Sequence, residues 1–195
     1  PAHDTGSRPN QRPLCLESAP TPAIATDLQA WATFLANSNN RFYGELEWRA
    51  LEAMGETGLG ATDERVVMNR ILRGWHRLKF GDLEGSIADL TEAERLSVAS
   101  VPNWRARSRQ LLGVAWMRKA ETTNCLTNPS ASSCVVPFDD HGVHTDPAGM
   151  TAAGDALLRL LDEDRPAVQS PQWLYNVTFM ALGEWPLGVP ERWRL

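Results

Sequence analysis

The sequence predicts an all-α fold of antiparallel helix pairs, and three features lead to this prediction. Apolar residues recur three or four positions apart along most of the chain and almost never alternate as they would in a strand. Short polar or glycine-containing segments, such as Gly81-Asp82, separate the apolar stretches. With 43% apolar residues in 195, the chain can bury a core of ordinary size. We therefore expect one helical domain over residues 23–195.

The first 22 residues are expected to lie outside that domain. They are rich in proline, show no period, and bury too little apolar surface to offset the entropy of ordering them. The segment is either a plain tail or an extended arm that lies along another surface. It contains Cys15, an odd cysteine that we count among the candidate partner-binding residues.

The expected helices are delimited by ordinary start and stop signals. Thr26 or Asp27 caps the first helix, and a glycine-containing stretch at 55–60 ends the second. Acidic residues open the third, and Pro102 occupies a favourable first-turn position in the fifth. In order, the expected helices cover about residues 27–35, 42–54, 62–80, 83–100, 102–121, 148–161 and 171–183.

A degenerate repeat runs through these helices. Gly74, Ser86, Leu90 and Ala93 fall on the small, small, bulky and small positions of a tetratricopeptide-like (TPR-like) unit of about 34 residues. The next unit opens with Leu112-Gly113-x-x-Trp116. Small residues at these positions let two helix axes approach closely. The sequence thus predicts a TPR-like α-solenoid, with a generic helical bundle as the alternative.

The second repeat is interrupted by a long insertion over residues 121–147, where the helical pattern stops. Cys125 and Cys134 lie nine positions apart in it and could close a small ring; a disulfide is favoured over a metal site or two free thiols. The spacing from these cysteines to His141 and His144 matches none of the usual zinc-site arrangements, so both histidines are interpreted as loop-packing residues.

No arrangement of residues typical of catalysis is found. The sequence lacks a phosphate-binding glycine loop, a nucleophile elbow and the common metalloprotease and haem-attachment motifs. Asp139 and Asp140 beside His141 are read as solvated turn residues. Asn176 begins a glycosylation pattern, but it is expected in mid-helix on a packing face. We therefore expect a protein that is not an enzyme and that holds no cofactor and no metal.

Charge and hydropathy exclude three further classes. A net charge of −5 argues against a general nucleic-acid binder and against a polybasic membrane-surface protein. No stretch approaches the length of apolar sequence that a membrane span needs.

The stretch from about residue 73 to residue 195 resembles the TPR-like region that precedes the β-propeller (VCBS/FG-GAP) and ASPIC/UnbV portions of exported bacterial proteins related to cartilage acidic protein. The residues that carry this resemblance are Arg73-Gly74-Trp75, Phe80-Gly81-Asp82, Leu112-Gly113-Val114-Ala115-Trp116, Asn124-Cys125, Ser133-Cys134-Val135-Val136-Pro137, Gly142-Val143-His144, Trp173-Leu174-Tyr175-Asn176-Val177, Met180-Ala181-Leu182-Gly183 and Val189-Pro190-Glu191. The resemblance implies an exported protein, a disulfide between Cys125 and Cys134, and a binding function of undefined specificity.

The sequence departs from that family at its end. There the chain continues past the Val-Pro-Glu segment into a propeller, whereas this sequence stops at Leu195, which leaves either a fragment or a helical module used alone. Trp185, Trp193 and Leu195 are then candidate anchors for a partner, because tryptophans are enriched at interface hot spots. The alternative is that they pack back onto the last helices.

These features together predict a scaffold for protein–protein interaction in the bacterial periplasm or outside the cell. It would be an extrinsic subunit of a larger, membrane-associated envelope complex, without a membrane span and without a nucleic-acid partner. The alternative hypothesis is a protein that binds a metal or a small ligand through the loop from Cys125 to His144.

Overall fold

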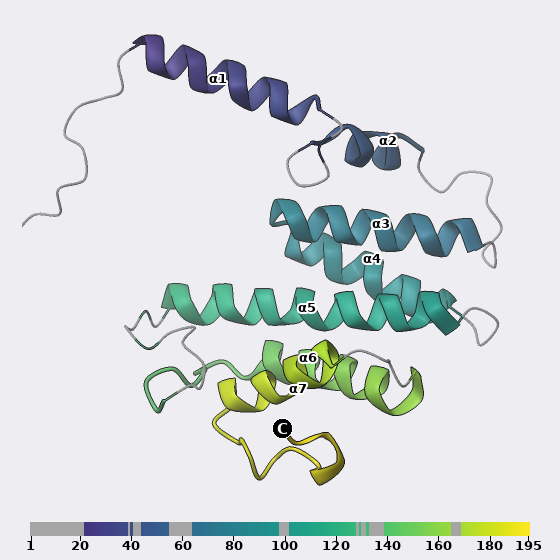
Figure 1. Cartoon of the computed structure of the whole chain (residues 1–195), viewed down its shortest axis with the longest axis vertical. Coiled ribbons are helices and arrows are strands. Elements are labelled where there is room, and N and C mark those ends of the chain that lie inside the picture. Colours follow the sequence, from purple (N-terminus) through teal and green to yellow (C-terminus); the bar gives the residue numbers. More distant parts are fainter. Residues whose placement is uncertain are drawn as a thin grey trace, which may run out of the picture. The chain divides into compact units, whose positions relative to one another are not determined.

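The computed structural model shows an all-helical chain (Figure 1). It describes residues 22–38, 40, 44–54, 64–97, 102–127, 129, 132, 139–164 and 169–195. No strand occurs among these residues, so the predicted all-α class is confirmed. The arm expected over residues 1–22, with Cys15, falls outside the described residues except for Pro22.

The helices follow the predicted order, with shifted ends. They are α1 (Pro22–Ala36), α2 (Leu46–Met54), α3 (Glu64–Phe80), α4 (Leu83–Leu96), α5 (Pro102–Thr127), α6 (Ala148–Arg159), the π-helical turn η1 (Leu160–Asp164), α7 (Ser170–Ala181) and the 3₁₀ turn η2 (Glu191–Trp193). The expected helix at 42–54 begins four residues later than predicted, at Leu46.

By its internal contacts the chain divides into two compact units, Pro1–Leu46 and Glu47–Leu195. The first unit contains α1, and the second contains α3 to α7 with nearly all of α2. Helix α1 therefore lies in a different unit from α3 to α7, and the single domain expected over residues 23–195 stays a prediction.

In the second unit, helices pack in the order of the sequence. Each of α3 to α6 packs against the next helix along the chain, and α3 also contacts α5. Figure 1 shows these helices as successive layers, coloured from teal to yellow. Contacts therefore run between near neighbours in the sequence.

Local signals explain the sharp turn between α3 and α4. Gly81 has φ of +86°, a left-handed conformation that glycine adopts without strain. Asp82 then caps α4, because its carboxylate accepts a hydrogen bond from the Gly85 backbone N at 3.0 Å. The two helices consequently form a tight hairpin.

Helix α5 runs on to Thr127, so the insertion does not begin at residue 121 as predicted. The last two turns are anchored by the buried Asn124, whose side-chain nitrogen donates to the Ala120 and Asp146 carbonyls at 2.9 and 3.1 Å. Its oxygen accepts from the Asp146 backbone N at 2.9 Å. Because a polar side chain anchors these turns, the apolar period did not reveal them.

Two buried clusters form the core of the second unit. One joins α3, α4 and α5, and the other joins α5, α6, α7 and the C-terminal segment. Both depend on a glycine in close contact with a leucine: a Cβ on Gly74 would lie 2.7 Å from Leu90 Cγ, and one on Gly113 would lie 2.8 Å from Leu157 Cγ. Gly74 and Leu90 are the residues that the sequence placed on small and bulky positions of a repeat, and the next helix pair shows the same kind of contact.

Candidate functional site

The C-terminal segment folds back onto α7 and is held there by one buried side chain. Asn176 is completely buried, and its side-chain nitrogen donates to the Trp193 carbonyl at 2.7 Å. Its side-chain oxygen accepts from the Trp185 indole and from the Leu195 backbone N, both at 3.2 Å. Burial of Asn176 agrees with its rejection as a glycosylation site.

Trp193 is held by a second hydrogen bond, which its own indole donates. Its indole nitrogen donates to Asp162 Oδ1 at 2.9 Å, and Arg192 reaches both oxygens of the same carboxylate at 3.0 Å. The Trp193 ring is half-buried against the core cluster of α5 to α7. Of the two alternatives left open for this residue, the structure shows the ring packed onto its own chain.

Three large apolar side chains remain exposed around Asn176. Trp173, Trp185 and Leu195 keep 50%, 40% and 60% of their surface in solvent. Trp173 lies one helical turn before Asn176, and the other two residues bond to its side-chain oxygen. We call Trp173, Trp185 and Leu195 the C-terminal face. The sequence analysis had singled out Trp185 and Leu195, together with Trp193, but not Trp173, whose helical spacing from Asn176 was the available signal.

The largest group of charges in the described chain surrounds Asp89, which is almost fully buried in α4. Arg70, Arg73 and Arg77 of α3 approach its carboxylate; the Arg70 and Arg77 nitrogens lie at 2.8 and 3.1 Å, and Arg73 bonds to both oxygens. Burial alone would raise the pKa of Asp89, but hydrogen bonds from Arg73 and Arg70 and the charges of Arg73 and Arg77 hold it below its ordinary value. The cluster fastens α3 to α4.

A second charged group joins α4 to α5, α6 and η1. Glu94 of α4 accepts hydrogen bonds from Arg109 of α5 at 2.8 Å and from Arg159 of α6 at 2.9 Å. Arg109 also pairs with Glu163 at 2.8 Å and donates to the Arg159 carbonyl at 3.2 Å. The pKa of Glu94 is raised by burial but lowered more by its two arginines. Both charged groups thus connect helices within the chain.

Helix α1 exposes a wide apolar surface. Ile24, Leu28, Trp31 and Phe34 keep 51–64% of their surface in solvent, and Leu35 is partly buried. We call these five residues the apolar arc of α1. Trp31 and Phe34 meet edge to face with ring centroids 5.9 Å apart. The sequence analysis expected this helix over residues 27–35 but did not single out its apolar residues as a candidate site.

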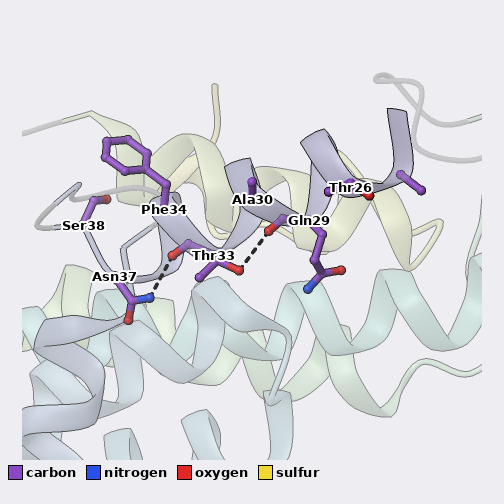
Figure 2. Close-up of a pocket in the computed structure, with 8 residues that line it drawn as sticks. Thr26, Gln29, Ala30, Thr33, Phe34, Asn37 and Ser38 are labelled. Carbon is purple, nitrogen blue, oxygen red and sulfur yellow. Dashed lines mark hydrogen bonds between the residues drawn. The ribbon is translucent and has the colours of Figure 1, made fainter. Parts of the chain in front are cut away.

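The opposite side of α1 is polar. Figure 2 shows Thr26, Gln29, Thr33 and Asn37 along this side, with Phe34 pointing away from Thr33. Thr33 Oγ1 donates to the Gln29 carbonyl at 2.9 Å, and the Asn37 side chain donates to the Thr33 carbonyl at 2.9 Å. A surface hollow runs along this strip, and its described wall comes from α1 and the two residues that follow it.

The proposed disulfide lies outside the described residues, because Cys134 and the side chain of Cys125 are not among them. Near the end of the insertion, Asp139 accepts hydrogen bonds from Ser132 at 2.7 Å and from the His141 backbone N at 2.9 Å, and the pKa of Asp139 is accordingly lowered. His144 is half-buried, which lowers its pKa, and its backbone N donates to the Ala181 carbonyl at 2.8 Å.

The described part of the chain contains no group of three or more histidine, cysteine or acidic residues placed to hold a metal ion. Among the described residues, no helix is long and apolar enough to cross a membrane.

Comparisons of the chain with protein-family models, with curated protein sequences and with solved structures find no match. The candidate sites therefore rest on geometry alone. They are two exposed apolar surfaces, one in each unit: the apolar arc of α1 in the first and the C-terminal face in the second.

Proposed function

We propose that this chain is a non-catalytic scaffold for protein–protein interaction, built as a TPR-like α-solenoid. It acts in the bacterial periplasm or outside the cell, as an extrinsic subunit of a larger envelope complex. The observation that carries the solenoid is the repeated contact of Gly74 with Leu90 and of Gly113 with Leu157 in successive helix pairs. Repeated pairs that contact mainly their neighbours are the architecture of binding solenoids.

The charged groups support a scaffold over a catalyst. Asp89 and Glu94 are the most buried carboxylates of the two clusters, and each lies between arginines that keep it ionised. A general acid or base needs a pKa near the working pH, whereas both of these pKa values are shifted away from it. Two carboxylates that stay ionised between arginines are suited to joining helices.

The C-terminal face is the proposed docking surface of the scaffold. Exposed aromatic side chains with few rotatable bonds are effective anchors in interfaces. Here the hydrogen bonds of Asn176 fix Trp185 and the backbone at Leu195, so little conformational entropy remains to be lost on binding. A partner would meet a preorganised surface.

The test is to isolate the protein from its native envelope in mild detergent, cross-link it, and identify its neighbours by mass spectrometry. We expect reproducible neighbours joined to the C-terminal face, and their loss in a Leu195→Asp variant. Leu126→Asp is the matched control, because Leu126 is an exposed leucine on α5 that lies outside that face. A protein recovered without neighbours, or equal loss in both variants, contradicts the proposal.

A further inference from the structure

Helix α1 is apolar over an unusually wide part of its circumference. At 100° per residue, the apolar arc and the flanking alanines cover roughly two-thirds of the helix. The polar remainder is the narrow strip of Thr26, Gln29 and Thr33. A helix at a protein surface usually needs an apolar stripe little wider than about 100°, and one that is apolar nearly all round is normally buried. The width of the apolar surface indicates that α1 is enclosed on several sides in the functional state of the protein.

The charge of α1 indicates whether a lipid surface or a protein encloses the helix. Asp27 is its single charged residue, and no lysine or arginine occurs in it. Anionic lipid surfaces attract helices with basic polar faces. A flat membrane surface would also cover only one side of the helix, so the composition favours a protein groove.

The size of α1 argues against pairing with a second copy. A helix of 15 residues is about 22 Å long. Two such helices side by side cover one flank of each other and fall short of the roughly 800 Å² per partner that stable interfaces bury. A groove with a floor and two walls covers far more of the same helix.

We propose that α1 docks as a helix into an apolar, three-sided groove of the partner protein. The apolar arc enters the groove, and the strip of Thr26, Gln29 and Thr33 stays in water. Because Asp27 falls within the apolar part of the circumference, the groove carries a basic or hydrogen-bond-donating group opposite it. This inference rests on the proposed function and adds α1 as a binding element beside the C-terminal face.

The test uses the full chain with a photo-crosslinking amino acid at one position. It is placed at Leu28 or Trp31 in the arc, at Gln29 in the polar strip as the matched control, or at Leu195 in the C-terminal face. After irradiation in the native envelope, we expect the same partner protein at positions 28 and 31, with about tenfold less adduct at position 29. Equal adducts at 28, 29 and 31, or none at any of them, overturn the inference.

Binding is then measured with the partner identified by the crosslink. Trp31→Asp is expected to weaken the affinity about tenfold or more, and Asp27→Lys to weaken it more than Asp27→Asn. Unchanged affinity in Trp31→Asp overturns the inference.

Three other occupants are separated by measurements on the purified chain. Protection of α1 amides from hydrogen exchange in the monomer would place the helix against its own chain. A dimer that Trp31→Asp dissolves would indicate a second copy, and flotation with phosphatidylcholine vesicles would indicate a lipid surface. Each of these results overturns the inference. Crosslinks at position 195 without any in α1 would retain the proposed function and remove only the role of α1.

Discussion

Gly113 of α5 meets Leu157 of α6 so closely that a Cβ on the glycine would lie 2.8 Å from the leucine Cγ. Real Cβ atoms essentially never come that close, so the two helices pack at this distance only because residue 113 has no side chain. Leu157 is completely buried, and its Cγ is held by the surrounding core. This contact sets the spacing of the second helix pair.

Gly113→Ala is therefore expected to destabilise the fold by about 1–3 kcal/mol, because the cost of overpacking exceeds the helix-forming advantage of alanine. Urea unfolding with an unchanged m-value measures the difference. Gly154→Ala is the control, since its Cβ would meet only the Thr178 hydroxyl at 3.3 Å. Equal effects of the two substitutions would contradict the prediction.

Asp89→Asn should destabilise the protein by about 3–5 kcal/mol, because it leaves the guanidinium groups of α3 around an uncharged side chain. Equilibrium unfolding at pH 7 tests this value. Glu92→Gln is the control: it removes a solvent-exposed pair with Arg95, and a loss under about 1 kcal/mol is expected.

The stabilisation from Asp89 also predicts a pH dependence. Its pKa is lower in the folded protein than its ordinary value of 3.8, so the unfolded chain takes up the proton first. The contribution is complete above that ordinary value and is lost as the pH falls from it toward the lower folded pKa. The free energy of unfolding should decline less steeply in Asp89→Asn than in the parent over this acid range. Parallel curves would show that Asp89 does not contribute.

Arg109→Lys is expected to cost about 1–3 kcal/mol although the charge is kept. A lysine has one nitrogen at its tip and cannot reach Glu94, Glu163 and the Arg159 carbonyl together, as the guanidinium does. Thermal unfolding measures the loss. Arg95→Lys, at an exposed position, should leave the melting temperature nearly unchanged.

Asn176→Ala should loosen the C-terminal segment and lower stability by about 1–3 kcal/mol, because several hydrogen bonds are lost at one buried position. Trypsin then cleaves faster after Arg192 and Arg194, which mass spectrometry detects. Gln172→Ala removes one longer bond to the same carbonyl and serves as the control. Identical cleavage rates in both variants would show that Asn176 does not hold the segment.

The helices and their closest contact could be predicted from the sequence because both depend on local pattern. The period of apolar residues located the helices, and the small residue at Gly74 indicated where two helix axes approach closely. The prediction of helix ends was less accurate where hydrogen bonds of polar side chains determine them. Asn124 extends α5 through hydrogen bonds to a segment 22 residues away, which no local pattern contains.

The surroundings of the candidate site were harder to predict for a related reason. Whether the Trp193 indole turns inward depends on Asp162, 31 residues earlier, whose role only the folded chain reveals. The arginines around Asp89 did leave a signal: Arg70, Arg73 and Arg77 share one face of a helix at spacings of three and four. Three cations on one face indicate a buried acid on the neighbouring helix.

The hydrogen bonds of Asn124 have a consequence for protein engineering. They join the end of α5 to Asp146, which lies just before α6. The two ends of the intervening loop are therefore held next to each other. The entropy of closing a loop grows only slowly with its length. Residues 128–138, which follow the end of α5 and precede the segment that contacts α7, could thus be exchanged for an epitope, a label or a second binding peptide while α5 and α6 keep their register. The hydrogen bonds of Asn124 would thus make the loop between α5 and α6 a suitable place to graft a foreign peptide.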